Sequence, residues 1–481
     1  GGGMNLLYDS NSLRLAELPY RFEAGTPNLS GIIGFSEAIK YLNEIGMDNI
    51  ERHEKYLKKY LIKELEKIPY IKIYNKDTEG SIVIINIDGF GDTGNGGITR
   101  LSLSKEALEA RAEFKKRMET LGATIVSDDM ANIYATIPGT EDLPPILSGS
   151  HLDSVRQGGN YDGVLGVLSA LEAVETIVTN QIPHRHPITV VVWTNEEGAR
   201  FEPAMMSSGV ICGKFAKEDM LKSEAKDIPG YTFEDALEES GWKGSVENRM
   251  NPAKTAACVE LHAEQGPVLD AEGVDIGVVE GVCGMVNYEF TFEGQADHAG
   301  TFPMKYRKDA LYACAKAIDY LHTELDKLDE ELVYTTGKIS AHPNIHTIIP
   351  DVVHMTLDSR HKDMNVMKQV VDVIHNIPAE LAKCKVSYKE DWARNTVEFH
   401  KPFVDKVEES AKECGYTYRR MYSGAGHDAQ YVCDVVPTTM IFVPSVDGHS
   451  HCELEYTPVE NCLKGANVLL HTLLKIDESE N

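Results

Sequence analysis

The chain has 481 residues, with 47 lysines and arginines against 75 aspartates and glutamates, a formal net charge of −28. This acidic balance argues against a nucleic-acid partner, because contacts with phosphates need a basic face. No apolar run approaches the ~20 residues of a membrane-spanning helix, and residues 1–10 lack the basic and apolar regions of a signal peptide. The nine cysteines form no CxxC pair. An odd number of scattered cysteines favours reduced thiols and a cytoplasmic location.

Residues 1–89 differ in composition from the rest of the chain. They hold one of the 17 histidines and none of the nine cysteines. An apolar stripe over 57–68 predicts a helix, and the segments 71–74 and 81–87 predict strands. The glycine-rich segment 88–97 is the expected joint to the second part of the chain. We therefore expect the chemistry in that second part.

Residues 18–61 read LPYRFEAGTPNLSGIIGFSEAIKYLNEIGMDNIERHEKYLKKYL, which closely resembles the C-terminal part of cysteine desulfurases. Those are pyridoxal-phosphate enzymes of the class V aminotransferase fold, and the resemblance covers about residues 1–88. It implies an α+β fragment without chemistry, because the family's cofactor-binding lysine would precede this segment and its catalytic cysteine would follow it. We interpret residues 1–89 as a non-catalytic remnant, joined by gene fusion or by an artefact of sequence assembly.

Beyond the joint, helices and strands are expected to alternate. Ser104 is a candidate N-cap for a helix that ends at Gly122, and residues 163–178 predict a buried helix. Residues 144–154 and 188–194 predict strands, the second almost continuously apolar. Such strands between helices indicate an α/β fold with a parallel sheet covered on both faces. Ligands bind such sheets at the carboxyl ends of the strands.

Polar clusters follow both of these strands. His151 and Asp153 are two residues apart, so in an extended segment Asp153 faces the same side and can orient the imidazole of His151. Asp162 lies in the glycine-bounded turn GGNYDG, and Glu196 and Glu197 close the apolar strand. Each feature alone has a commoner structural explanation, such as a turn-stabilising aspartate or a pair of solvated acids. Their shared position after strands is what favours a site.

Further histidines extend this set of candidate ligands. His262 stands between two glutamates in VELHAEQG, and His427, His449 and His451 follow towards the C-terminus. Two divalent ions ~3.5–4 Å apart need a bridging carboxylate, further ligands on each ion and a free acid–base carboxylate. Histidine, aspartate and glutamate suit zinc, manganese or cobalt without any thiolate. Together the clusters predict a site for two divalent metal ions.

A second resemblance rests on motifs that appear in the order GSHLDS, GGNYDG, TNEEGARF, ELHAEQG, GQADHAG, SGAGHDA and SHCELEYT. They closely resemble the hydantoinase/carbamoylase family of amidases, dinuclear metallohydrolases that include N-carbamoyl-L-amino acid hydrolases and allantoate amidohydrolases. The resemblance runs from about Gly91 to Leu474. It implies an exopeptidase-like α/β catalytic domain in two segments, 90–279 and 393–481, with an inserted α+β dimerisation domain at 280–392.

The resemblance also implies roles for individual residues. Glu196 would be the general base. His451 is preferred to His449 as a ligand because it occupies the family's Ser-His position. The implied metal ligands are Asp162, bridging both ions, with His151 and His262 on one ion and Glu197 and His451 on the other.

The inserted domain is implied to complete the site. His298 in GQADHAG would act on the active site of the neighbouring subunit of a homodimer, where it would hydrogen-bond the developing oxyanion. Gln265 and Arg360 match substrate contacts, with Arg360 as a bidentate partner of a carboxylate. Thr347 stands where the family commonly has asparagine, which departs from the pattern at a substrate contact. The hydrolase part begins near residues 96–104, so the family's first helix is expected to be missing or replaced.

We therefore expect a metal-dependent amidohydrolase that cleaves the ureido C–N bond of N-carbamoyl-L-amino acids to the amino acid, ammonia and carbon dioxide. Allantoate or another ureido compound is the alternative substrate, and a non-catalytic, desulfurase-derived interaction module is the alternative class. His427 and Asp428 are expected to line the pocket without contacting metal. His184 and His186 are expected on a surface loop.

Overall fold

The computed structural model describes residues 90–479 throughout and, before them, residues 7–9, 12–14, 40, 46, 52–53, 55–56, 58–60, 62–63, 71–73 and 85–87. The chain forms two compact units, 1–89 and 90–481. In the first, β1 (Leu7–Asp9) pairs antiparallel with β2 (Ser12–Arg14), and β3 (Ile71–Ile73) with β4 (Ile85–Ile87). β3 and β4 fall within the two expected strands. Residues 58–60 and 62–63 are helical, and the rest of the helix expected at 57–68 lies outside the described residues.

A nine-stranded sheet forms the centre of the second unit, in the order β17-β10-β19-β9-β7-β8-β6-β5, with β18 also paired to β10. Strands β19, β9, β7 and β8 are mutually parallel, whereas β6 is antiparallel to β8 and β10 to β19. The strands are β5 (Thr124–Ser127), β6 (Ile133–Ile137), β7 (Ile146–His151), β8 (Ile188–Trp193), β9 (Ala257–Ala263), β10 (Ile276–Val282), β17 (Val397–Glu398), β18 (Tyr418–Ser423) and β19 (Thr438–Val443).

The expected parallel sheet therefore forms the centre, while its edge strands are antiparallel. β5 and β6 are joined only by residues 128–132, and a loop of that length forms a hairpin rather than the long crossover that parallel strands need. The centre agrees with the prediction, since β7 and β8 are buried along their whole length. Helix α4 (Val164–Asn180) connects them and matches the helix expected at 163–178.

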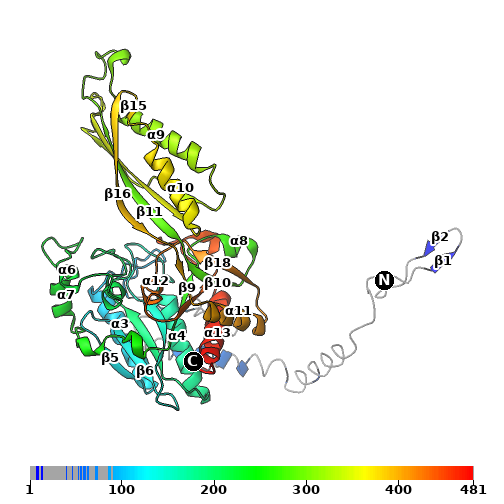
Figure 1. The fold of residues 1–481 in the computed structure, drawn as a ribbon. Helices are drawn as coiled ribbons and strands as arrows, with labels where there is room; N and C mark the ends of the chain where they lie inside the picture. The colour runs from blue at the N-terminus through cyan, green and yellow to red at the C-terminus, as the bar shows by residue number, and fades with distance from the viewer. Residues whose placement is uncertain are drawn as a thin grey trace. The chain divides into compact units, whose positions relative to one another are not determined.

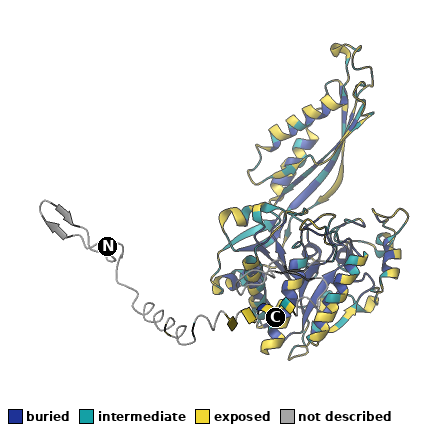
Figure 2. Cartoon of the chain, turned by 180° about the vertical axis from the view of Figure 1, so that it is seen from behind, coloured by how far each residue is buried: buried dark blue, intermediate teal, exposed yellow. Residues whose placement is uncertain are grey.

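The strands of this sheet lie in the buried interior that Figure 2 shows in dark blue, and apolar side chains pack on both faces. Alternate side chains of β8 point to opposite faces: Val190 and Val192 join one core cluster, and Val191 and Trp193 another. The first cluster includes helices α3 (Lys105–Thr120), α4, α11 (Lys401–Glu413) and α13 (Val459–Asp477). Ser104 caps α3 by accepting the N–H of Ala107, as predicted. The shorter helices are α5 (Met206–Ile211), α6 (Lys217–Met220), α7 (Phe233–Ser240), α8 (Val268–Glu272) and α12 (Ala429–Val432).

A second sheet, antiparallel throughout, is inserted in the chain between β10 and β17 and lies within residues 284–394. Two helices, α9 (Ala310–Leu325) and α10 (Met364–His375), pack on one of its faces (Figure 1). We call this part the lid. Its sheet consists of β12 (Val333–Thr335), β14 (Val352–His361), β11 (Gly284–Glu293), β16 (Cys384–Arg394) and β15 (Glu380–Leu381), with β13 (Ile339–His342) beside β14.

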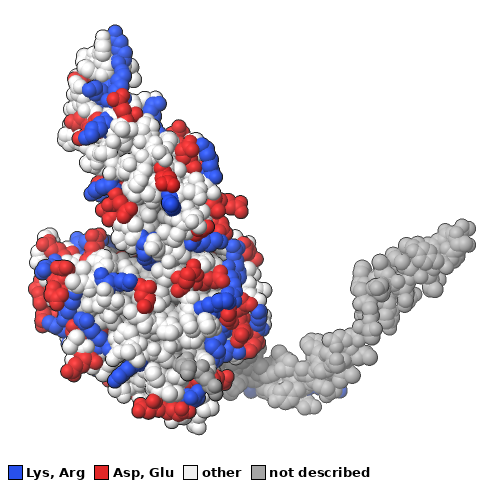
Figure 3. Space-filling model, viewed as in Figure 1, with Lys and Arg blue, Asp and Glu red and all other residues white. Residues whose placement is uncertain are grey.

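The surface carries both signs of charge. On the face in Figure 3, acidic and basic side chains are interspersed over the described residues. No helix in the described part of the chain is long and apolar enough to span a bilayer.

The surface position expected for His186 is wrong, because its side chain is buried. Its backbone N–H donates to the carboxylate of Asp477 at 2.6 Å, and its ring Nδ1 lies 2.7 Å from the carbonyl oxygen of Pro144. Asp477, at the end of α13, is distant in sequence.

Candidate metal centre and active site

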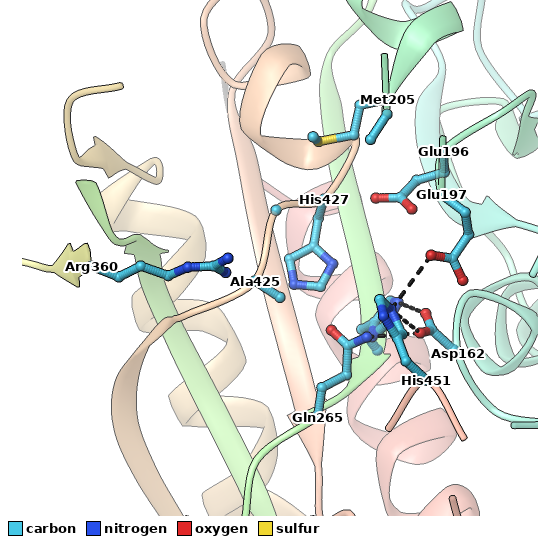
Figure 4. Close-up of a pocket in the computed structure, with 12 residues that line it drawn as sticks. Asp162, Glu196, Glu197, Met205, Gln265, Arg360, Ala425, His427 and His451 are labelled. Carbon is cyan, nitrogen blue, oxygen red and sulfur yellow. Dashed lines mark hydrogen bonds and ion pairs between the residues drawn. The ribbon is translucent and has the colours of Figure 1, made fainter. Parts of the chain in front are cut away.

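Loops at the carboxyl ends of the parallel strands bring the candidate ligands together (Figure 4). His151 is the last residue of β7, and His262 lies near the end of β9. Glu196 and Glu197 follow β8, and the loop after β19 carries His451. Because β7, β8, β9 and β19 are parallel neighbours, these ends share one edge of the sheet.

Asp162 lies at the centre of this group. Its Oδ1 is 3.5 Å from Nε2 of His151 and 3.2 Å from Nε2 of His262. Its Oδ2 is 3.2 Å from Nε2 of His451, which in turn is 3.4 Å from the carboxylate of Glu197. The ligand atoms thus fall into two groups that share the carboxylate, one on each of its oxygens. His449, the alternative to His451, is in neither group.

The turn that carries Asp162 is fixed by two features. Gly163 has φ +66°, and a Cβ there would lie 2.3 Å from Cε1 of His151. Glu455 accepts the N–H groups of Tyr161 and Asp162 at 2.9 and 3.0 Å. Its other oxygen accepts the hydroxyl of Ser450 at 2.9 Å. Glu455 was not among the predicted site residues, and the only signal for it in the sequence is an acid inside the motif SHCELEYT.

Asp153 contacts His151 mainly through its backbone and the loop after β8 through its side chain. Its backbone carbonyl oxygen, 2.9 Å away, is the partner of Nδ1 of His151, while its carboxylate is 3.9 Å from that nitrogen. The carboxylate instead accepts the N–H groups of Glu196 and Glu197, each at 3.3 Å. The carboxylate thus lies within ion-pair distance of the imidazole but makes its hydrogen bonds with the loop after β8, because the chain turns after β7.

Crowded carboxylates shift the protonation of the site. Burial raises the pKa of Glu197 to about 8, with further elevation from Asp162. Burial also raises the pKa of Glu196 well above its usual range. At Asp162 burial acts in the same direction, but hydrogen bonds with the three surrounding histidines outweigh it and hold the pKa well below normal. The hydrogen bond with Asp162 raises the pKa of His451 to about 9. A concentration of buried negative charge of this kind suits cations.

A cavity of about 210 Å³ opens beside these groups. Gln265 and Arg360 line it, as does His427, which is absent from the two groups that share Asp162. Gln265 donates from Nε2 to Asp162 at 2.7 Å. Arg360 reaches the cavity from β14 of the lid and donates to the carbonyl oxygen of Gly424 at 2.7 Å. The lid and the catalytic part of the same chain thus meet at this cavity.

His298 and Thr347 do not line this cavity, although both lie in the lid and are exposed. Their backbones lie side by side: the N–H of Ala299 donates to the carbonyl oxygen of Thr347, and His298 forms an isolated antiparallel β-bridge with Ile348. Nδ1 of His298 accepts the N–H groups of Gly300 and Thr301 at 3.0 and 3.2 Å. In the neutral imidazole the proton therefore resides on Nε2, which leaves that atom as a donor.

Two further groups of potential ligands occur among the described residues. One combines Glu260 and His427 with His262, which also belongs to the first of the two groups described above. The other consists of Asp329, Glu331 and His361 in the lid. In this group Glu331 already forms an ion pair with Lys362 at 2.5 Å. Nδ1 of His361 accepts the N–H of Asp363, so in the neutral imidazole the proton lies on Nε2, the nitrogen that faces Asp329. This second group is therefore poorly suited to a cation.

The sheet, the inserted lid and the ligand clusters at the strand ends define an α/β protein with a candidate metal centre. Residues 147–475 match peptidase family M20/M25/M40. An N-carbamoyl-L-amino-acid amidohydrolase of Rhizobium meliloti is 38% identical over 80% of this chain and 92% of the relative. An allantoate amidohydrolase of Bacillus subtilis is 35% identical over 80% and 94%. A crystal structure of a hydantoinase/carbamoylase family amidase from Burkholderia multivorans superposes with a TM-score of 0.75, at 38% identity over 82% of this chain and 95% of that one.

The chain belongs to peptidase family M20/M25/M40 and, within it, to the hydantoinase/carbamoylase amidases. It is a hydrolase of carbon–nitrogen bonds other than peptide bonds. Residues 1–94 match the class V aminotransferases, which confirms the fold family inferred for the first part of the chain, and the resemblance to cysteine desulfurases within it stays a prediction. The predicted fold class is confirmed as well.

Proposed function

We propose that the protein hydrolyses the ureido C–N bond of N-carbamoyl-L-amino acids and yields the free amino acid, ammonia and carbon dioxide. One observation carries this proposal: Asp162 offers one carboxylate oxygen to His151 and His262 and the other to His451. A carboxylate shared in this way is what two adjacent divalent ions require. The carbamoylase relative from Rhizobium meliloti, at 38% identity, supports the choice of substrate.

The donor set fits two divalent ions. Each group offers imidazole nitrogen and carboxylate oxygen without thiolate, which suits zinc, manganese or cobalt. We assign His151, Asp162 and His262 to one ion, and Asp162, Glu197 and His451 to the other. When bound, the ions supply polarisation of the substrate carbonyl and acidification of water.

Glu196 is the proposed general base. Its side chain is buried and lies 3.6 Å from Nε2 of His151, but it belongs to neither ligand group. It takes the proton of the attacking water and delivers it to the leaving nitrogen. Burial raises the pKa of Glu196 above the usual range of a glutamate, which strengthens the carboxylate as a proton acceptor. Gln265 and Arg360 orient the substrate from the cavity wall.

We propose a homodimer in which His298 donates from Nε2 to the oxyanion in the partner's site, with Thr347 beside it. The free donor on Nε2 and the exposure of both side chains support this role.

The segments 90–279 and 393–481 would form the catalytic domain and 280–392 the dimerisation domain, with 1–89 a fused, non-catalytic fragment. All nine cysteines are free thiols, which supports a location in the cytoplasm.

Allantoate is the second candidate substrate, because the relative from Bacillus subtilis that carries this activity is 35% identical. A substrate panel on the metal-loaded protein decides between the two. N-carbamoyl-L-amino acids and allantoate are each incubated with the protein after dialysis against manganese, cobalt or zinc, and ammonia release is measured. Release from N-carbamoyl-L-amino acids, with little from allantoate, is expected. The reverse pattern would replace the proposed substrate.

The role of Glu196 is tested by Glu196→Gln. We expect turnover to fall by about 10²–10⁴-fold, the usual contribution of a general base, with the metal content per chain unchanged. Glu202→Gln is the matched control, because Glu202 lies in the same loop but is exposed and pairs with Lys226. Full activity of Glu196→Gln would exclude it as the base, and loss of metal would make it a ligand instead.

A further inference from the structure

Two arginines occupy equivalent places at the end of the lid sheet that faces the catalytic part. Met285 of β11 is paired with Arg360 on β14 and with Arg394 on β16. Directly opposed residues of antiparallel strands project to the same face. Arg360 and Arg394 therefore share a face, two strands apart, with about 10 Å between their Cα atoms.

Only one of these two guanidinium groups has its positive charge balanced by a carboxylate. Arg360 donates to both oxygens of Asp358, at 2.7 and 3.4 Å, as well as to Gly424. Nη2 of Arg394 donates to the carbonyl oxygen of Cys283 at 3.3 Å, while its Nε and Nη1 are buried without a hydrogen-bond partner. Among the described residues, no carboxylate pairs with Arg394.

The surroundings of Arg394 leave its charge unbalanced. Burial lowers its pKa, Tyr431 and Cys433 counteract this in part, and the neighbouring charge of Arg360 lowers it further. Arginine nevertheless stays protonated in proteins. A partly buried charge whose Nε and Nη1 have no hydrogen-bond partner is costly, so such a group is an expected binding partner for an anion. The charge also acts on His427, which lines the cavity.

We propose that Arg394 is a specificity-determining residue: it supplies the uncompensated positive charge that selects substrates with a free carboxylate. This inference rests on the proposed function and deepens it, because Arg360 is already neutralised by Asp358 and cannot provide the net charge alone. The substrate carboxylate lies on the Arg360 side of the cavity. Arg360 orients it, and Arg394 attracts it across the weakly screening protein interior. An uncharged analogue gains nothing from Arg394.

The test compares N-carbamoyl-L-alanine with its uncharged carboxamide on the metal-loaded protein. For Arg394→Gln we expect the KM for the acid to rise about 10- to 100-fold, the loss of one charged interaction, with kcat nearly unchanged. The KM for the carboxamide stays the same. Arg394→Lys keeps the charge and restores most of the affinity for the acid. Arg419→Gln is the control, because Arg419 is a partly exposed arginine that pairs with Glu272.

If Arg394→Gln raises the KM equally for the acid and the carboxamide, Arg394 has only a structural role and the proposal is overturned. An unchanged KM for both substrates would also overturn it. If neither Arg394 variant folds, a structure of Glu196→Gln with N-carbamoyl-L-alanine decides. A substrate carboxylate within about 6 Å of the Arg394 guanidinium supports the proposal, and a substrate carboxylate bound elsewhere overturns it. If the wild-type protein cleaves neither compound, the proposed function fails by itself. Calorimetric binding of the acid and the carboxamide to wild type and Arg394→Gln then still tests Arg394.

Discussion

At the scale of single residues, Asp153 illustrates how a side chain can support a site without contacting the ligand. Its carboxylate receives two backbone N–H groups, from Glu196 and Glu197, and so fixes the loop that presents both acids. The imidazole of His151 is held by the backbone carbonyl oxygen of Asp153, which no substitution removes. The side chain and the backbone of one residue therefore position two different strand ends.

Asp153→Asn separates these two contributions. The amide offers one acceptor oxygen in place of two, so one N–H group of the Glu196–Glu197 loop loses its partner. We expect metal affinity to fall about 10- to 100-fold, the usual effect of losing a group that orients a ligand, with activity partly restored by excess metal. Chelator competition measures the affinity, and the exposed Asp219→Asn is the control. Unchanged affinity would show that the loop does not need this carboxylate.

At the scale of elements, local patterns predicted β7, β8 and α4, because apolar runs and caps are short-range features of the sequence. The same patterns predicted that His151, Asp162 and Glu197 lie in one site, because the carboxyl ends of parallel strands share an edge of the sheet. The antiparallel edge strands, the burial of His186 and the role of Glu455 escaped prediction. The last two depend on a partner that is distant in sequence, as Asp477 is for His186 and Tyr161 for Glu455.

The turn before α4 makes a prediction at this scale. Gly163→Ala places a Cβ 2.3 Å from the ring of His151, in addition to the strain of an L-residue at φ +66°. Gly241→Ala is the matched control, because Gly241 has φ +70° with open space around it. The control should lose about 1–2 kcal/mol of unfolding free energy from backbone strain alone. Gly163→Ala should lose more and should also bind less metal.

Thermal unfolding and metal content of the two variants provide the measurement. Equal destabilisation, with full metal content in both, would show that the His151 ring can move aside. A selective loss of metal in Gly163→Ala would tie the glycine to the position of His151, independently of its backbone conformation.

At the scale of the whole molecule, the cavity of one chain is lined by Glu196, Gln265 and Arg360 but not by His298 or Thr347 of the lid. In a dimer with twofold symmetry, the segment that carries His298 and Thr347 would be supplied to each site by the other subunit. The exposure of His298, with its Nε2 free to donate, fits a role outside its own chain.

Mixed dimers of His298→Ala and Glu196→Gln chains test this arrangement, since each parent alone should be nearly inactive. In a mixed dimer, the His298→Ala subunit keeps its own Glu196 and receives an intact His298 from its partner, so one of the two sites is complete. Random mixing of equal amounts makes about half of the dimers mixed, so about a quarter of wild-type activity should return. Refolding or co-expression with two different tags supplies the mixture, and ammonia release measures it. If His298 served its own subunit, neither site of the mixed dimer would be complete, and activity would stay at the level of the parents.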